Sequence, residues 1–200
     1  KEQDNMSTAL GFKWDIFVFG AEEDMPDNVN LSKLTANNSF SSPDGLWFSK
    51  STGICWIQTD DGAFTDETNC MLLASVPGTV GDGGEFYVDN SLTSGTSTTT
   101  GVTKTFIGGV LGESRLRRFL AAPKGAEVTG LTETADGKTM FVNIQHPGEN
   151  TPAQGTAANL TLESTWPGNG GGIQAAYGPA GRPRSATLII TKNDGGKIGL

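Results

Sequence analysis

A short β-hairpin pattern occurs twice in this sequence, and the repetition restricts the folds that are open to the chain. In the first copy, Gly45-Leu46 begins a strand, a turn follows, and an apolar strand ends at Ile57-Gln58. In the second copy, the same order runs from Gly130-Leu131 to Ile144-Gln145, and we expect its turn to be two residues longer. Repeated β units of about 40–50 residues are typical of β-propellers.

The composition favours an all-β fold with long loops. The 28 glycines and 9 prolines, together with abundant Thr, Ser and Asn, disfavour a mostly helical chain and suit strands joined by many turns. Outside the repeat, apolar or alternating runs predict strands at Phe12–Phe19, Cys70–Val76, Arg115–Leu120 and Ser185–Thr191. Two polar, glycine-rich stretches are predicted to be long loops: Gly78–Gly101 and Asn150–Pro183.

The length of 200 residues gives one domain of ordinary size, with room for about three propeller blades. Closed propellers need at least four blades, and an open arc leaves an unpaired strand at each end. We therefore predict a partial β-propeller, in which residues 1–200 form part of a single domain whose other blades lie outside this chain. Those blades, or edge-paired self-association, would protect the open edges.

Charge and hydropathy argue against two kinds of partner. The net charge of −8 disfavours nucleic acid, because binding the phosphate backbone requires clustered Lys and Arg. The short basic run Arg115–Arg118 is more typical of a solvated strand face. There is no run of 18 or more apolar residues, so we expect no membrane span. The acidic surplus does suit calcium, which binds the oxygen atoms of Asp and Glu.

The two cysteines do not form a disulfide framework. Cys55 lies in an apolar strand and Cys70 begins the next one, so we expect buried thiols rather than a disulfide. A zinc site is not expected either, because one His and two Cys without paired spacing cannot supply four ligands.

Several polar side chains fall at the ends of predicted strands, where the strands of a propeller would face a common channel mouth: Asp44, Asp60, Asp61, Glu127, Gln145, His146 and Arg184. Glu127 stands between small residues that leave room for an ion, although a lone Glu at a strand start is more often solvated. His146 precedes a proline and suits a turn, as does Asp44 within Pro43-Asp44-Gly45. No nucleophile elbow and no phosphate-binding P-loop are present.

Five ordered segments resemble the C-terminal part of the PhoX-type alkaline phosphatases: SSPDGLWF, ICWIQTDDG, RRFLAAPKGAEVTGLTETADGKTMFVNIQHPGE, STWPGNGG and RPRSATLIIT. The resemblance covers most of the chain outside the long loops. It implies a six-bladed propeller that is exported by the twin-arginine route to the periplasm or the outside of the cell. It also implies hydrolysis of small phosphomonoesters at a cluster of calcium and iron ions.

The resemblance also implies roles for individual residues. Glu127 resembles a metal-ligand glutamate of the family, and Asp44 is a weaker candidate for the same role. Lys124, Arg184 and His146 lie in or near matched segments and are candidates to face the substrate phosphate. The Cys-Glu-Glu segment that carries other metal ligands in the family is absent here, since Cys55 precedes Trp56 and Cys70 precedes Met71. We therefore expect this chain alone to have little or no activity.

Two other interpretations remain open at this point. The chain is alternatively a secreted, non-catalytic β-propeller binding module whose acidic loops hold structural calcium. It is also consistent with a purely structural fragment that completes a partner chain by pairing along a sheet edge. The phosphatase interpretation requires Glu127 to bind a metal, whereas the binding-module interpretation leaves Glu127 without a role.

Overall fold

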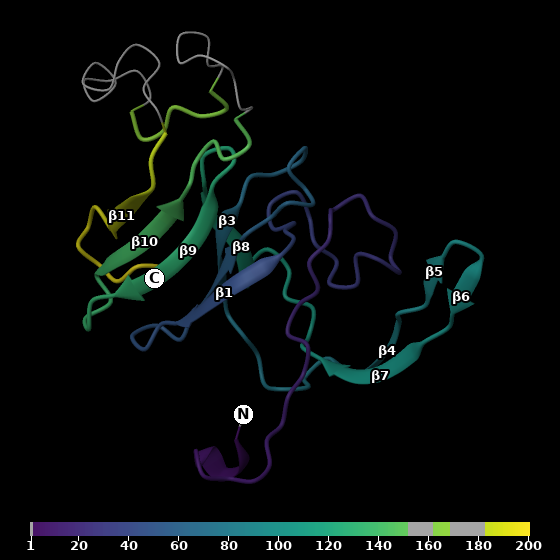
Figure 1. The fold of residues 1–200 in the computed structure, drawn as a ribbon. Coiled ribbons are helices and arrows are strands. Elements are labelled where there is room, and N and C mark those ends of the chain that lie inside the picture. Colours follow the sequence, from purple (N-terminus) through teal and green to yellow (C-terminus); the bar gives the residue numbers. More distant parts are fainter. Residues whose placement is uncertain (1, 152–161, 169–182) are drawn as a thin grey trace.

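The structure, a computed structural model, describes residues 2–151, 162–168 and 183–200 (Figure 1). These residues form strands and loops, with one short 3-10 turn, η1 (Gln3–Asn5). The strands are β1 (Pro43–Phe48), β2 (Cys55–Thr59), β3 (Met71–Ser75), β4 (Gly84–Asp89), β5 (Leu92–Ser94), β6 (Ser97–Thr99), β7 (Val102–Ile107), β8 (Leu116–Ala121), β9 (Glu127–Glu133), β10 (Thr139–Gln145) and β11 (Ala186–Thr191). The prediction of an all-β chain is therefore confirmed for the described residues.

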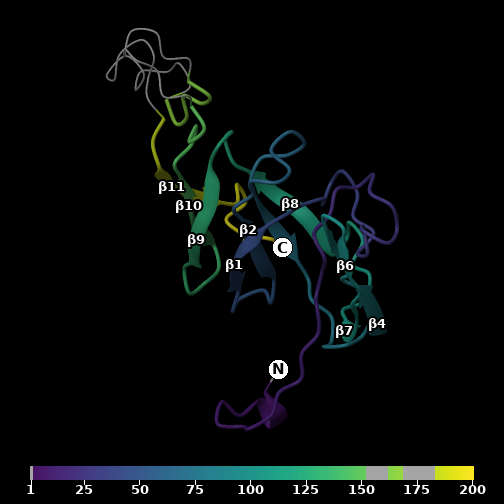
Figure 2. The ribbon, with the colours of Figure 1, turned by 45° about the vertical axis from the view of Figure 1, so that its right-hand side comes forward.

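Two antiparallel sheets make up the body of the molecule (Figures 1 and 2). One has the strand order β1-β2-β3-β8, and the other has the order β11-β10-β9. All five residues of β2 are buried, because both faces of this central strand are covered. Strand β11 alternates between half-buried and exposed residues, as expected for a strand with one face in water.

The main hydrophobic core lies between these two sheets. Trp56 and Leu72 from the four-stranded sheet pack with Val128, Met140 and Val142 from the three-stranded sheet, and all five are fully buried. Each such side chain contributes about 1.5–3 kcal/mol by leaving water. Strand β9 is the strand of its sheet that contacts β1, β2 and β3. The first residue of β9 is therefore held close to the four-stranded sheet.

A second core covers the opposite face of the four-stranded sheet. Phe40 and Leu34, from the loop that precedes β1, and Leu111, from the loop that precedes β8, pack on Ile57 and Leu73. The loop before β1 is fixed by polar side chains as well, since the buried Asn30 amide accepts a hydrogen bond from the Leu34 backbone N–H and donates one to the Leu34 carbonyl oxygen. Both faces of the sheet are thus covered over its centre.

The register of the two repeated hairpins corrects the predicted alignment of the repeat. Leu46 pairs with Ile57, and Leu131 pairs with Val142, so Ile57 corresponds to Val142 rather than to Ile144. Six residues lie between the paired Phe48 and Cys55, and six lie between the paired Glu133 and Met140, so the predicted two-residue difference is wrong. Each hairpin also shows a register irregularity beside its glycine, near Gly45 and Gly130. Asp44 therefore lies within strand β1, at a β-bulge, and not in the predicted turn.

The predicted strand Phe12–Phe19 is absent. This segment makes single bridges, including one between Ile16 and Ile107, and the side chains of Phe12 and Trp14 are mostly exposed. A strand needs hydrogen-bonded partners along its length. Along the β7 edge, Ile16 alone provides them: its N–H donates to the carbonyl oxygen of Phe106, and its carbonyl oxygen accepts from the N–H of Gly108. The apolar pattern of this segment therefore did not lead to pairing with a neighbouring strand along its length.

The predicted loop Gly78–Gly101 contains strands as well. Strands β4 and β7 form a two-stranded ribbon that extends from the body, and β5 and β6 pair beyond it (Figure 1). Exposed side chains along the ribbon, such as those of Tyr87 and Val102, agree with its predicted place on the surface. The other predicted loop, Asn150–Pro183, lies largely outside the described residues.

The four-stranded sheet has the strand number of a propeller blade. The other sheets have three, two and two strands, so the count of three blades stays a prediction. In the described part of the chain, no helix is long and apolar enough to cross a membrane.

Candidate functional site

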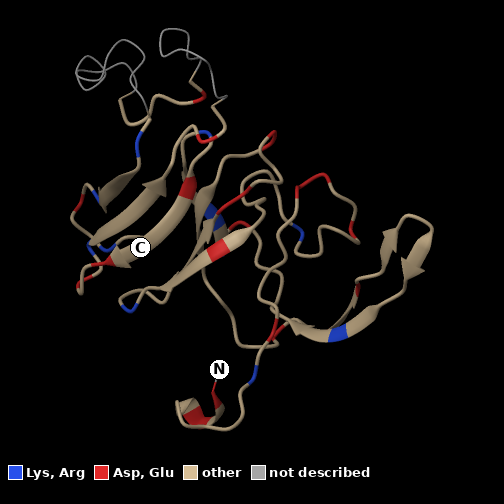
Figure 3. Cartoon of the chain, in the orientation of Figure 1, with Lys and Arg blue, Asp and Glu red and all other residues tan. Residues whose placement is uncertain are grey.

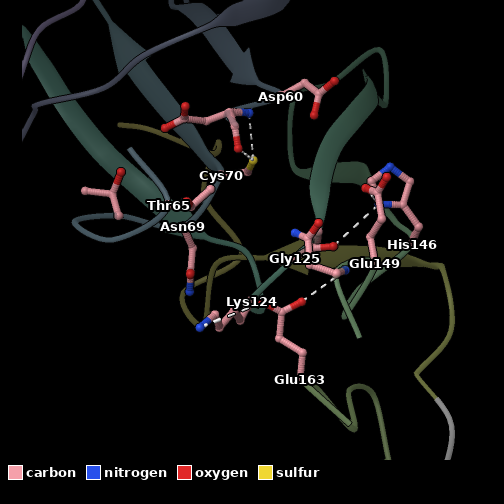
Figure 4. Close-up of a pocket in the computed structure, with 13 residues that line it drawn as sticks. Asp60, Thr65, Asn69, Cys70, Lys124, Gly125, His146, Glu149 and Glu163 are labelled. Atoms are coloured by element: carbon pink, nitrogen blue, oxygen red, sulfur yellow. Dashed lines mark hydrogen bonds and ion pairs between the residues drawn. The ribbon is translucent and has the colours of Figure 1, made fainter. Parts of the chain in front are cut away.

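Loops that follow β2 and β10, together with the loop that precedes β9, enclose a small cavity of about 50 Å³ (Figure 4). Most of its lining residues are polar or charged. The lining residues are Asp60, Asp61, Thr65, Thr68, Asn69, Cys70, Lys124, Gly125, Ala126, His146, Glu149, Asn150 and Glu163. Three residues predicted at strand ends, Asp60, Asp61 and His146, therefore do meet in one place.

The repeat explains why two of these residues meet. With Leu46 equivalent to Leu131 in the hairpin register, Asp61 and His146 occupy corresponding positions just after the second strand of each copy. The two hairpins pack against each other through β9, which brings these positions to the same end of both sheets. A carboxylate from one copy and an imidazole from the other thus line the same cavity.

Glu127 is the first residue of β9 and pairs with Gln145 at the end of β10. Only 9% of the residue is exposed, so its carboxylate is removed from most of its water. Oε2 of Glu127 lies 3.4 Å from Nε2 of His146. Burial raises the pKa of the Glu127 carboxyl, and the negative charge of Asp60, with a smaller effect of Asp44, raises it further. His146 opposes this change through a hydrogen bond and its charge.

His146 is held at both its backbone and its ring. Its φ of 34° lies in the left-handed region that non-glycine residues seldom adopt. The backbone N–H donates a hydrogen bond of 2.9 Å to Oγ of Ser185, at the start of the last strand region. Nδ1 of the ring lies 2.8 Å from Oε2 of Glu149 (Figure 4). The imidazole is therefore placed between two carboxylates.

The loops around His146 are clamped together by backbone hydrogen bonds. The N–H of Gly148 donates to the carbonyl oxygen of Lys124 at 2.8 Å, and the N–H of Glu149 donates to that of Gly125 at 3.2 Å. Gly125 has a φ of 65°, and a Cβ at this position would lie 3.0 Å from the N atom of Glu149 and 3.1 Å from Cα of Gly148. A side chain at position 125 would separate the loops.

The two basic candidates, Lys124 and Arg184, differ in their position relative to the cavity. Lys124 lines the cavity, with 61% of its side chain exposed, and its Nζ is 3.8 Å from Oε1 of Glu163. Most other charged residues of the lining are acidic, and an acidic segment is visible at the start of β9 in Figure 3. The backbone N–H of Arg184 donates to the carbonyl oxygen of Trp166, and Arg184 is not among the residues that line the cavity.

Asp61 and Cys70 form a structural part of the cavity wall. Oδ1 of Asp61 accepts hydrogen bonds from the backbone N–H groups of Ala63 and Phe64 and from Oγ of Ser41. The N–H of Asp61 donates to Sγ of Cys70 at 3.0 Å. Cys55 and Cys70 are both free and buried, which confirms the expectation of thiols. Burial raises the pKa of the Cys70 thiol, so this sulfur is not a ready nucleophile.

Asp44 is exposed on β1 and does not line the cavity, although its charge reaches Glu127. Over residues 2–151, 162–168 and 183–200, no three His, Cys, Asp or Glu side chains converge closely enough to hold a metal ion. The structure thus brings Glu127 beside His146 and places His146 and Lys124 in the cavity wall, whereas Glu127, Asp44 and Arg184 are not among the lining residues.

Comparison with known proteins places the chain in a family. The sequence model of the family described as "Alkaline phosphatase PhoX" matches residues 1–148, which is more than half of the chain. The chain belongs to the PhoX alkaline phosphatase family. The structure of Pseudomonas fluorescens PhoX in complex with vanadate, a transition state analogue, is 34% identical and is matched over 81% of this chain, with a TM-score of 0.48. No curated protein matches.

This chain spans only 20% of the length of Pseudomonas fluorescens PhoX. The range that matches the PhoX family includes Lys124, Glu127 and His146 and ends before Glu149. Glu149 and Glu163, which contact His146 and Lys124, were missed by sequence reasoning. For Glu149 a signal did exist, because a Pro-Gly pair after His146 predicts a turn that brings the third residue back toward the imidazole.

Proposed function

We propose that this chain is part of a metal-dependent phosphomonoesterase and supplies Glu127 to its metal centre. Membership of the PhoX alkaline phosphatase family carries the proposal. The surroundings of Glu127 support it, because a buried carboxylate whose pKa is raised by neighbouring negative charge is a group that a cation would stabilise. This chain spans 20% of the length of Pseudomonas fluorescens PhoX, and the activity that we propose is that of the whole enzyme.

Calcium and iron, the ions implied by the family, fit the type of donor that the chain offers. Both accept carboxylate oxygens, and calcium in particular binds clusters of Asp and Glu. Glu127 is the buried donor, while Asp44 and Asp60 contribute negative charge around it. Because no three such groups converge among the described residues, the remaining ligands would come from parts of the enzyme outside this set. The bound ions would neutralise phosphate oxygens and orient the ester.

The substrate that suits this site is a small phosphomonoester. Its dianionic phosphate needs positive partners, and Lys124 is the cation in the cavity wall. The contact of Lys124 with Glu163 is long, at 3.8 Å, so Lys124 is free to turn toward an anion. Arg184 and His146 stay candidates for contact with phosphate in the assembled enzyme. We place that enzyme in the periplasm or outside the cell, and we expect the isolated chain to have little or no activity.

The decisive experiment replaces Glu127 in the full-length protein. With Glu127→Ala, we expect hydrolysis of an aryl phosphate to fall by at least about 100-fold and the content of bound metal to fall with it, because even partners one step removed from a metal are worth 10–100-fold. Glu67→Ala is the matched control, since Glu67 is exposed and lies outside the cavity lining. Normal activity and metal content in Glu127→Ala would contradict the assignment of Glu127 to the metal centre, whereas a parent protein without phosphatase activity would favour a non-catalytic binding module.

A further inference from the structure

The imidazole of His146 faces a carboxylate on each side. Nδ1 is 2.8 Å from Oε2 of Glu149, and Nε2 is 3.4 Å from Oε2 of Glu127. The two carboxylates differ in surroundings, because the Glu127 side chain is 11% exposed and that of Glu149 is 59% exposed. The shorter contact is therefore made to the more solvated partner, at the outer side of the ring.

Hydrogen-bond geometry assigns a proton to Nδ1. A neutral imidazole carries one N–H, and a carboxylate only accepts, so a contact of 2.8 Å requires Nδ1 to be the donor. The carbonyl oxygen of Gly125 is a second acceptor for the same proton, at 3.4 Å. With Nδ1 protonated, Nε2 is the atom that the ring presents to Glu127, either as a lone pair or, in the imidazolium, as a donor.

The position of Glu149 is fixed by the chain and not only by the ion pair. Its backbone N–H is bonded to the carbonyl oxygen of Gly125, and Gly148 is bonded to Lys124 in the same clamp. The left-handed φ of His146 is followed by a turn over residues 147–150, and the Glu149 side chain lies beside the ring. Glu149 has thus lost much of its freedom before its side chain meets Nδ1, which lowers the entropy cost of the contact.

We propose that Glu149 is a positioning residue, which holds the proton on Nδ1 of His146 and so directs Nε2 toward Glu127. Glu149 acts through His146 and has no direct contact with the substrate in this role. The orientation of the His146 ring follows from contacts within this chain. The value of that orientation for catalysis rests on the proposed function of Glu127. A carboxylate that fixes the tautomer of an imidazole is a recurring way of orienting such rings.

The test uses ¹⁵N NMR of the 200-residue chain labelled at histidine, where His146 gives the signal because the sequence contains one histidine. In the neutral ring, observed at high pH, we expect Nδ1 to carry the proton. In Glu149→Ala we expect Nδ1 to lose its proton and Nε2 to gain one. Glu149→Gln, whose amide oxygen still accepts, is expected to restore the original tautomer. Glu67→Ala serves as the control and is expected to leave both resonances unchanged.

An unprotonated Nδ1 in the parent chain, or a protonated Nδ1 that persists in Glu149→Ala, would overturn the proposal. The second result would mean that the Gly125 carbonyl holds the proton. In the full-length enzyme, we expect Glu149→Ala to lower kcat/KM by about 10–100-fold and Glu149→Gln to recover most of it. A tautomer change without any loss of activity would support the positioning of the ring and contradict its value for catalysis, while Glu127→Ala tests the proposed role of Glu127 independently. The positioning role of Glu149 and the proposed function of Glu127 can thus be contradicted independently.

Discussion

Glu127 combines burial with negative neighbours, and that combination has a consequence for stability. Its pKa is raised in the folded chain, mainly by burial and next by Asp60. The folded state therefore binds the proton of this carboxyl more tightly than the unfolded state does, and the stability that this provides is present below the ordinary pKa of about 4.3 and is lost as the pH rises through the raised value. In the absence of metal, ionised Glu127 destabilises the fold.

We predict that Glu127→Gln makes the metal-free chain more stable than the parent at pH 8, and that this advantage shrinks toward zero near pH 4. Gln keeps the size of the side chain and removes the charge that burial and Asp60 penalise. Thermal unfolding at several pH values, with Glu67→Gln as a control for general charge effects, measures the difference. An advantage that is the same at every pH would rule out burial of the charge as its cause.

At the scale of single residues, sequence reasoning found Glu127 and His146 but described their surroundings poorly. Two features of the sequence indicated these residues: the small residues beside Glu127, and the position of His146 at the end of a predicted strand of the repeat. The burial of Glu127 was not visible, because it depends on β9 packing against strands that lie more than fifty residues earlier in the chain. Contacts of Glu149 and Glu163 depend on loop conformations, which local sequence patterns specify weakly.

At the scale of elements, the clamp between the loops at 124–125 and 148–149 requires glycine at position 125. We predict that Gly125→Ala lowers the free energy of unfolding by more than about 1 kcal/mol, because it combines a positive φ with a Cβ against the Glu149 backbone. Gly53→Ala is the matched control, since Gly53 has a φ of 77° and no atom within 4 Å of its added Cβ. Urea unfolding of both variants separates the cost of the positive φ from the cost of the Cβ contact with the clamp. Equal losses of unfolding free energy in the two variants would show that the clamp contact adds nothing.

Most strands of the two main sheets were predicted from their apolar or alternating runs, including β8 and β11, whose partners β3 and β10 lie far away in the sequence. Both hairpins of the repeat, strand β8 and strand β11 are present. The error at Phe12–Phe19 has a different origin, because that segment would have needed a distant free strand edge and has only the bridge to Ile107. The wrong turn length in the repeat came from aligning Ile57 with Ile144 by residue type, whereas the register is set by pairing across the hairpin.

At the scale of the whole molecule, the sequence predicted a sheet-rich chain with open edges, and the described sheets do have them. Strands β1 and β8 flank one sheet, and β9 and β11 flank the other. On β1, Leu46 and Phe48 share a face with the buried Ile57 and Cys55, yet they are 63% and 60% exposed. The second core therefore stops short of β1, which leaves an apolar face beside an unpaired strand edge.

We predict that the isolated chain self-associates through this edge. Light scattering over a range of concentrations should give a mass that rises above the 20.9 kDa of one chain. The double variant L46K/F48K should stay near that mass, because charges on an edge strand oppose pairing. Leu92→Lys, at a similarly exposed leucine on β5, beyond the β4–β7 ribbon, should behave like the parent. A parent chain that is monomeric at all concentrations, or association that L46K/F48K does not weaken, would contradict self-association through the edge of β1.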